Sequence, residues 1–346
     1  MPKTFYTEVP RIVAIGDLHG NYQGFRKILM NTGLINSHGH WMARNTHLIQ
    51  LGDILGRGGE PGKIFKLLRR LEEEAPAYQS HVHVLLGNHE AMTMSGLLMY
   101  NTMAEFHDLS QEDLVESLVA SVVDPLEVRG NLEGTSSPDW SPMPMEEKLE
   151  AAEVAKSNRK KALVLETANK LEAGKYGRRL EAMGCQEFRA SLSPWGKVGK
   201  WLCSHDSAVI INDTLFVHGG LNREHGCQPL EHLNNNVRDT LGKHLPPDAK
   251  LDIMLRRDGP QWNREFTLKP NEAKGRELNE VLDYHDCKRM VVGHTPTSCI
   301  TPSKVGSILP LYNEKLICID TGIGKTYGEH LSALSLERHD LTAHYM

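Results

Sequence analysis

Three short motifs in the N-terminal third combine acidic, imidazole and amide side chains with flanking glycines. They are Gly16-Asp17-Leu18-His19-Gly20, Gly52-Asp53-Ile54-Leu55-Gly56-Arg57-Gly58 and Gly87-Asn88-His89-Glu90. Two later motifs each add a histidine, His218 within residues 216–220 and His294 within residues 293–296. Carboxylate, imidazole and amide ligands without a thiolate favour Mn, Fe, Zn or Mg over a structural cysteine–zinc site. The residue types therefore predict a site for divalent metal ions.

Any one of these residues has an ordinary structural explanation. A single Asp before a turn usually caps that turn, and a single buried His is usually only hydrogen-bonded. The glycines beside all five motifs are harder to explain in this way, since glycine permits tight turns and a close approach of the backbone to a ligand. The set as a whole therefore favours a functional site.

The chain around these motifs alternates between predicted strands and helices. Short β-branched and apolar runs predict strands at residues 12–15, 46–51 and 81–86. Apolar residues at helical spacing predict helices at 22–31 and 63–74. Each predicted strand ends where a polar motif begins. Because ligand sites of open α/β sheets lie at the carboxyl ends of strands, we expect the motifs to meet at one edge.

Strand patterns return in the C-terminal half. Residues 208–211 and 214–217 flank Asn212-Asp213, a pattern that predicts a hairpin with a polar turn. Further strands are predicted at 289–292 and 316–319, with a final strand at 331–336. The second hairpin strand leads into His218, and the strand at 289–292 leads into His294.

The middle of the chain, residues 91–201, shows helical patterns and loops without a convincing strand. A helix is predicted at 145–172, where Ala, Glu, Lys and Leu are abundant. One helical face is predicted to carry a packed seam of Met92, Met99, Met103 and Phe106. We therefore expect a single catalytic domain over residues 1–346, with 91–201 as a helical insertion or cap within it.

Composition excludes several classes of protein. The 346 residues are 40% hydrophobic and 24% charged, which is typical of a globular protein, and the net charge of −5 gives no basic field for nucleic acid. Six scattered cysteines without a CxxC pattern favour reduced thiols. Neither a signal peptide nor a membrane-length apolar run is evident. We expect a cytoplasmic protein with no nucleic-acid or membrane partner.

Taken together, the motifs resemble the PPP family of metallophosphatases, within the calcineurin-like metallophosphoesterase superfamily. The Phe216-Val217-His218-Gly219-Gly220 form and the run Asp258-Gly259-Pro260-Gln261-Trp262-Asn263-Arg264 are most similar to the bacterial-type branch, and within it to the Shewanella-like protein phosphatases. The resemblance implies an α/β fold in which a β-sandwich is flanked by helices, in the layer order αββα. It leaves the helical middle region uncovered.

The resemblance also implies a role for each motif residue. Asp17 and His19 would hold a first metal ion, Asp53 would bridge two ions, and Asn88, His218 and His294 would hold the second. His89 would act as general acid, while Arg57 and Arg264 would bind the phosphate oxygens. The implied cofactors are two divalent ions (Mn, Fe, Zn or Mg), with Mn expected to support activity in vitro. A surface ion pair is an equal alternative for Arg264, and Tyr327 is expected to be a packed tyrosine.

The chain departs from the family pattern at Gly56. Most members carry an Asp there that pairs with the general acid, here His89. Another carboxylate, from the insertion or Asp320, could replace it, or His89 could work alone as a slower acid. A phenoxide leaving group needs protonation less than an alkoxide, so a third interpretation is a preference for phosphotyrosine or aryl phosphates. If the acid limits the rate, Gly56→Asp should raise activity on alkyl phosphates.

The leading functional prediction is a metal-dependent phosphomonoester hydrolase. It would act on phosphoproteins, at Ser/Thr or Tyr phosphate, by direct attack of a metal-bridging water. A dinucleoside polyphosphate hydrolase uses the same motifs, and Trp140, Trp195 or Trp201 could stack a base. A weakly active or non-catalytic phospho-binding module is the alternative from a different class. The sequence does not identify a regulatory partner.

Overall fold

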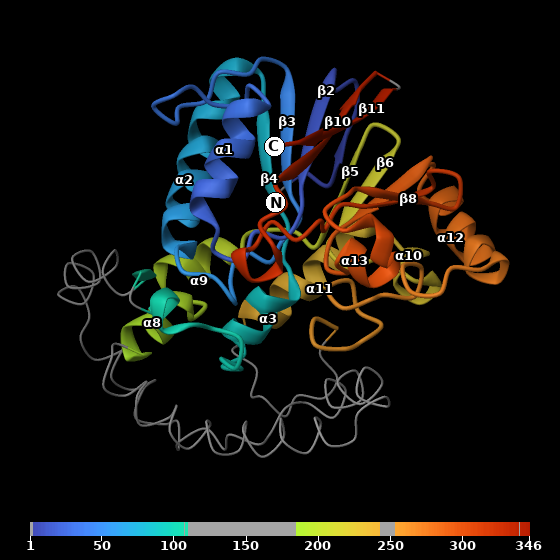
Figure 1. Cartoon of the computed structure of the whole chain (residues 1–346). Helices are drawn as coiled ribbons and strands as arrows, with labels where there is room; N and C mark the ends of the chain where they lie inside the picture. Colours follow the sequence, from blue (N-terminus) through green and yellow to red (C-terminus); the bar gives the residue numbers. More distant parts are fainter. Residues whose placement is uncertain (1–2, 107, 110–184, 243–252, 339) are drawn as a thin grey trace.

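Two β-sheets form the centre of the molecule (Figure 1). The computed structural model describes residues 3–106, 108–109, 185–242, 253–338 and 340–346. Within these residues, sheet A has the strand order β1-β5-β6-β7-β9-β8 and sheet B the order β11-β10-β2-β3-β4. The strands are β1 (Phe5–Tyr6), β2 (Arg11–Ile15), β3 (Thr46–Gln50), β4 (His81–Val84), β5 (Ala208–Ile211), β6 (Thr214–Val217), β7 (Arg289–Val292), β8 (Leu309–Leu311), β9 (Leu316–Cys318), β10 (Ser332–Glu337) and β11 (Asp340–Tyr345).

The first three predicted strands form the parallel part of sheet B. β2 pairs with β3 and β3 pairs with β4, both in parallel, so their carboxyl ends lie at one edge. In sheet A, β5 and β6 form the predicted antiparallel hairpin, and β6, β7 and β9 run parallel. The parallel strands of each sheet therefore bring their following loops together, as the motif order predicts.

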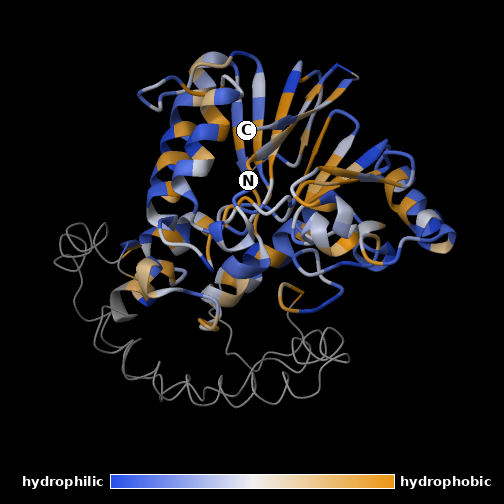
Figure 2. Cartoon of the chain, in the orientation of Figure 1, coloured by the Kyte–Doolittle hydropathy of each residue, from blue (hydrophilic) through white to orange (hydrophobic). Residues whose placement is uncertain are grey.

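Helices cover the outer faces of both sheets. One apolar core lies between the sheets and contains residues of both, such as Ile49 and Phe216. A second core packs α1 and α2 on sheet B, and a third packs α11 and α12 on sheet A. Figure 2 shows the hydrophobic residues concentrated on the strands and on the inner faces of these helices. This is the predicted αββα layering. The helices are α1 (Tyr22–Asn31), α2 (Pro61–Glu74), α3 (Asn88–Met94), α8 (Cys185–Leu192), α9 (Lys197–Leu202), α10 (Arg223–Gly226), α11 (Leu230–Gly242), α12 (Glu272–Tyr284) and α13 (Thr297–Ile300), with short 3-10 helices η1 (Ala75–Tyr78), η2 (Pro302–Lys304) and η3 (Lys325–Tyr327).

Two predictions were wrong in detail. The strand at β10 is not the last, because β11 pairs with it in antiparallel register. The predicted methionine seam is not one helical face, since α3 ends at Met94 and Gly96 follows in the left-handed conformation that commonly ends helices. Met92 and Phe106 are buried, whereas Met99 is 37% exposed.

Part of the predicted insertion lies among the described residues. Residues 91–106, 108–109 and 185–201 contain helix and loop and no strand. The helix predicted at 145–172 lies outside the described residues, and so does Trp140. No helix in the described part of the chain is both long enough and apolar enough to cross a bilayer.

Candidate metal and phosphate site

The predicted ligands lie just beyond the ends of five strands, in loops or, for Asn88, at the first residue of α3. Asp17 follows β2, Asp53 follows β3, Asn88 follows β4, His218 follows β6 and His294 follows β7. Each of these side chains is at most 5% exposed, and His19 is 4% exposed. Loops from both sheets therefore converge on one buried cluster, which brings together residues that lie up to 277 positions apart.

Asp53 lies at the centre of the cluster. Its Oδ2 atom is 3.9 Å from His19 Nε2 and 3.8 Å from His89 Nε2, while its Oδ1 atom is 3.4 Å from His218 Nε2. Asp53 belongs to both of the buried groups at the site that could hold an ion, His19–Asp53–His89 and Asp53–His218–His294. A carboxylate with one oxygen in each group has the geometry expected of a bridging ligand.

Backbone contacts turn the imidazole Nε2 atoms toward the cluster. His19 Nδ1 lies 3.1 Å from the Leu55 carbonyl, and His218 Nδ1 lies 2.7 Å from the Leu51 carbonyl. His294 Nε2 is buried without a hydrogen-bond partner among the described residues. A metal-binding histidine commonly uses one ring nitrogen for such an outer contact and leaves the other for the ion.

Asn88 and Asp17 join the cluster through further contacts. Asn88 Oδ1 lies 3.1 Å from His218 Nε2. Both carboxylate oxygens of Asp17 accept the His294 backbone N–H at 3.1 Å. All six predicted ligands are thus brought together.

Electrostatics show that this donor set fits divalent cations. Burial, followed by repulsion from Asp320 and Asp53, raises the pKa of Asp17 well above its usual range. Burial lowers the pKa of His19 to about 4 and that of His218 to about 3. The imidazoles are therefore neutral donors, and the carboxylates repel one another. Cations of high charge would relieve this repulsion, and O and N donors without thiolate suit Mn, Fe, Zn or Mg.

Glu90 fixes the loop that carries Asp53, a role that the sequence analysis missed. Its carboxylate accepts the backbone N–H groups of Asp53, Ile54, Leu55 and Gly87 at 2.8–2.9 Å. The loop is strained, because Asp53 and Arg57 have φ angles of 55° and 66°. A Glu three residues after the helix-capping Gly87 was the available signal, since that spacing is typical of a capping box.

Gly56 and His89 are in direct contact. A Cβ atom built on Gly56 would lie 2.0 Å from His89 Nδ1, and Gly56 has a φ of 78°. The imidazole therefore occupies the space that a side chain at residue 56 would need. Asp320 does not replace the missing acid: its carboxylate accepts the Gly322 N–H at 3.2 Å, and in the described structure it forms no hydrogen bond or ion pair with His89.

Aromatic rings flank Arg57, the predicted phosphate ligand. Its guanidinium carbon lies 4.5 Å from the ring centroid of Tyr100 and 5.4 Å from that of Tyr327. The Tyr100 ring also lies 5.2 Å from the His89 ring, and Tyr327 lies 5.2 Å from His19. The Tyr327 ring therefore packs against two residues of the cluster, and Tyr100 was not anticipated.

Arg264 contributes charge to the same cluster. Its positive charge is among the causes that lower the pKa of His89, His218 and His294. The neighbouring Arg256 instead forms an ion pair with Asp258.

The insertion supplies a buried acid next to Gly56. Glu105 accepts the Thr102 N–H at 2.8 Å and the Asn101 side-chain amide at 3.1 Å. Burial raises the pKa of Glu105 to about 8, and the nearby Gly56 backbone is among the groups that lower it. Glu105 thus touches the loop from which the family carboxylate is missing, although it contacts the backbone and not the imidazole.

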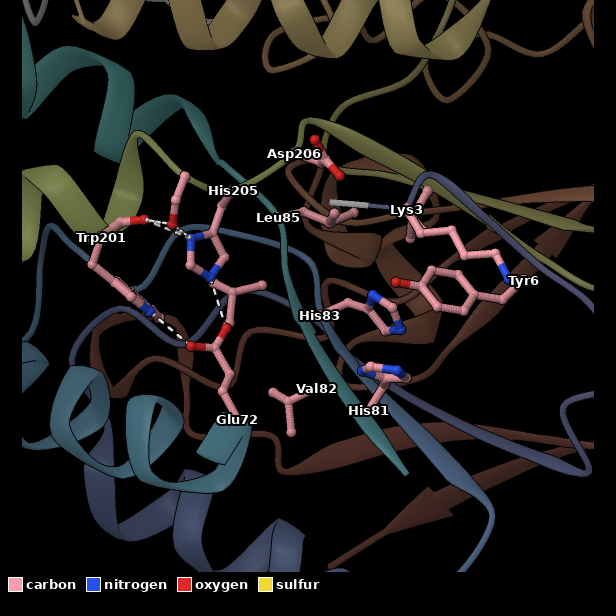
Figure 3. Close-up of a pocket in the computed structure, with 13 residues that line it drawn as sticks. Lys3, Tyr6, Glu72, His81, Val82, His83, Leu85, Trp201, His205 and Asp206 are labelled. Carbon is pink, nitrogen blue, oxygen red and sulfur yellow. Dashed lines mark hydrogen bonds and ion pairs between the residues drawn. The ribbon is translucent and has the colours of Figure 1, made fainter. Parts of the chain in front are cut away.

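Of the three tryptophans proposed for base stacking, the two that the structure describes, Trp195 and Trp201, do not lie among the predicted ligands. Trp201 donates to Glu72 Oε2 at 2.7 Å and lines a separate pocket (Figure 3). Trp195 is 63% exposed. The described tryptophan beside the ligands is Trp262, whose ring lies 5.7 Å from that of His294.

An αββα sandwich with carboxylates and imidazoles gathered at its strand ends defines a metallophosphoesterase. The calcineurin-like phosphoesterase family model matches residues 10–298, and the chain belongs to that family. The family implies divalent metal ions, and the buried donors described above fit them.

Named relatives agree with the predicted subfamily resemblance. Shewanella-like protein phosphatase 2 of Arabidopsis thaliana is 26% identical, with 98% of this chain and 78% of the relative covered. Shewanella-like protein phosphatase 1 of Plasmodium berghei (strain Anka) is 24% identical, with 96% and 73% covered. The solved cold-active protein-tyrosine phosphatase of a psychrophilic Shewanella species has the same fold, with a TM-score of 0.65 and 23% identity over 100% of this chain and 82% of that chain.

Proposed function

We propose that this protein is a metal-dependent phosphoprotein phosphatase that hydrolyses phosphomonoesters. The observation that carries the proposal is the position of Asp53, which is shared by two potential ion-binding groups and lies 3.8 Å from His89. Arg57 and Arg264 add positive charge around the same cluster. This combination suits a substrate with a dianionic phosphate.

The roles that the family motifs imply are assigned to residues of this chain as follows. Asp17, His19 and Asp53 would hold one ion, and Asp53, Asn88, His218 and His294 the other. When bound, two such ions supply an activated water for in-line displacement at phosphorus. Arg57 orients the phosphate through paired N–H donors, and the rings of Tyr100 and Tyr327 restrict its guanidinium. Arg264 offsets the additional negative charge of the transition state.

His89 would protonate the leaving oxygen. It is buried beside Asp53, and no side chain at residue 56 shares its proton. Without a carboxylate partner, its imidazolium form is less stabilised than in relatives that carry the Asp. A phenoxide leaves without a full proton transfer, whereas an alkoxide does not. We therefore propose phosphotyrosine and aryl phosphates as preferred substrates over phosphoserine.

Protein substrates are favoured over dinucleoside polyphosphates. The relatives are named as protein phosphatases, and one solved structure of the same fold is a protein-tyrosine phosphatase. Trp201, a candidate for stacking a nucleotide base, is hydrogen-bonded to α2 in another pocket.

Matched peptides test the proposal. Turnover is measured on phosphotyrosine and phosphoserine peptides of otherwise identical sequence, and on a dinucleoside polyphosphate, each with and without Mn²⁺. We expect Mn²⁺-dependent release of phosphate that is fastest from phosphotyrosine. A clear phosphoserine preference would contradict the leaving-group argument, and faster nucleotide hydrolysis would contradict the protein-substrate proposal.

The variant Asp53→Asn separates catalysis from binding alone. It keeps the size of the side chain but removes the shared charge, so metal-dependent turnover of p-nitrophenyl phosphate should be lost while the circular dichroism spectrum is retained. Equal inactivity of the unmodified protein on every phosphate ester would instead favour a phospho-binding module without catalysis.

A further inference from the structure

Arg57 lies in a strained stretch of backbone. Its φ angle of 66° is in the left-handed region, which is unfavourable for a residue with a long side chain. Such a conformation persists only where surrounding contacts fix it. The contacts that hold this backbone therefore also determine where the Arg57 guanidinium points.

The segment that follows β2 encloses part of this loop. Glu60 donates its backbone N–H to the Gly20 carbonyl at 3.1 Å. A Cβ atom built on Gly58 would lie 1.7 Å from the His19 carbonyl oxygen, so no side chain fits at residue 58. These contacts leave the Arg57 N–H and the Gly58 carbonyl to find partners elsewhere, because buried backbone groups are nearly always hydrogen-bonded.

The predicted insertion supplies both partners. The Arg57 N–H donates to the Tyr100 carbonyl at 2.8 Å. Thr102 Oγ1 donates to the Gly58 carbonyl at 2.5 Å. The two hydrogen bonds lie before and after the strained dihedral angles, so they hold that conformation from both ends. Any residue at position 100 would provide a backbone carbonyl, whereas the second bond depends on the Thr102 side chain.

A capping box fixes the Thr102 hydroxyl. The Thr102 backbone N–H donates to Glu105 Oε2 at 2.8 Å, and the Glu105 backbone N–H donates to Thr102 Oγ1 at 3.3 Å. A Thr that precedes a helical turn, with Glu three residues later, is the sequence pattern of this motif. Glu105 is fully buried, so water does not compete for these bonds. Because Oγ1 accepts the Glu105 N–H, its own proton is left to donate to Gly58.

We propose that Thr102 is a positioning residue for Arg57 and acts through the Gly58 carbonyl. The proposal rests on the proposed phosphatase function, in which Arg57 binds the phosphate. Arg57 Nε is buried and has no hydrogen-bond partner among the described residues, which is the state expected of a donor kept for a substrate oxygen. The ring of Tyr100 packs on the guanidinium, so Tyr100 restricts the side chain of Arg57 while Thr102 restricts its backbone.

A positioning role and a purely structural role for Thr102 lead to different results. A hydroxyl that only stabilises the fold changes the unfolding temperature and leaves the affinity for phosphate unchanged. A hydroxyl that positions Arg57 changes the affinity for phosphate, and it does so only while the Arg57 side chain is present. Inorganic phosphate is therefore a suitable probe, because it reports on the arginine without a leaving group.

Phosphate affinity and steady-state kinetics test the proposal in the full-length protein. The dissociation constant of inorganic phosphate is measured by titration calorimetry with Mn²⁺ present, and KM and kcat are measured on p-nitrophenyl phosphate. Thr102→Val replaces the hydroxyl by a methyl group, and we expect it to weaken phosphate binding and raise KM by about 2- to 10-fold, with a smaller effect on kcat. Thr102→Ser, which keeps the hydroxyl, should bind phosphate as wild type does.

Matched variants show whether the effect is specific. Thr342→Val makes the same substitution at an exposed position of the edge strand β11 and should bind phosphate as wild type does. Thr102→Ala also removes the hydroxyl, and it should show the same loss of affinity even if Thr102→Val does not fold. In an Arg57→Ala background, Thr102→Val should cause no further loss, because two residues that act through one contact are not additive.

Three results would overturn the positioning role and leave the phosphatase function standing. These are phosphate affinity that is unchanged in both Thr102→Val and Thr102→Ala, a loss in Thr102→Ser as large as that in Thr102→Val, and an undiminished loss in the Arg57→Ala background. In each case the wild type would still hydrolyse p-nitrophenyl phosphate. Absence of Mn²⁺-dependent turnover in the wild type would instead overturn the proposed function and this proposal with it.

Discussion

His89 rests directly on the backbone of Gly56, in the space that a side chain at residue 56 would occupy. A Cβ atom there would lie 2.0 Å from Nδ1 of the imidazole, and the φ angle of 78° is one that residues other than glycine rarely adopt. The family carboxylate and this position of His89, the proposed general acid, are therefore mutually exclusive. Replacing Gly56 does not simply restore a missing partner.

This contact reverses the sequence-based expectation for Gly56→Asp. We predict that Gly56→Asp and Gly56→Ala both displace His89 and lower turnover of phosphoserine peptides, by up to about 10²–10⁴-fold if the proton transfer is lost. The matched control is Gly33→Ala, because Gly33 has a φ of 68° but nothing within 4 Å of an added Cβ. Steady-state kinetics would contradict this prediction if Gly56→Asp were faster than wild type.

Removal of the imidazole should affect substrates unequally. His89→Asn keeps the backbone N–H that donates to Asp53 Oδ1 at 3.0 Å but removes the acid. We expect a loss of about 10²–10⁴-fold on an alkyl phosphate and a much smaller loss on p-nitrophenyl phosphate, whose leaving group needs little protonation. Equal losses of kcat on the two substrates would assign His89 to phosphate or metal binding instead.

The tyrosine next to Arg57 should affect phosphate binding. Tyr100→Leu removes the ring that lies 4.5 Å from the guanidinium carbon. A cation–π contact of about 0.5–2 kcal/mol corresponds to about a 2- to 30-fold loss in kcat/KM. Tyr100→Phe, which retains a ring, should lose less than Tyr100→Leu. Competitive inhibition by inorganic phosphate should weaken in parallel, and unchanged inhibition would exclude a role for Tyr100 in holding Arg57.

Because Glu105 is buried, the direction in which pH changes the free energy of unfolding can be predicted. Its pKa is raised from 4.5 to about 8, mainly by burial. Between these values the native state keeps a proton that the unfolded chain has lost, so the free energy of unfolding contributed by Glu105 falls as pH rises and levels off above about pH 8. Urea denaturation of wild type and Glu105→Gln should show the variant gaining relative stability from pH 5 to about pH 8. A constant difference over that range would contradict the prediction.

Most strands of the two sheets could be predicted, because the inner strands are buried and are followed by glycine-containing motifs. The run at residues 12–15 lies in β2, and the helix predicted at 22–31 has the bounds of α1. β11 gave no such signal, since it is an edge strand with alternating polar residues and mostly exposed side chains. β1 and β8 have two and three residues, which is too short for a periodic pattern.

The proposed ligand residues could be located in the sequence because each stands near a strand end within a glycine-flanked motif. Tyr100 and Glu105 could not, because they reach the site from the insertion through tertiary contacts with Arg57 and Gly56. Tyr327 was expected to be a packed tyrosine, but the sequence did not show that it packs against His19 and Arg57. Local sequence does not indicate that η3 lies beside His19.

The carboxylate of Glu90 accepts N–H groups from two segments, residues 53–55 and residue 87. These amides cannot exchange with solvent one at a time, because opening any of them exposes a buried charge that the others still hold. The loop of Asp53 should therefore behave in hydrogen exchange as part of the core sheet and not as a surface loop. Substrate entry must then depend on the outer residues that surround the site, while the loop that carries Asp53 stays fixed.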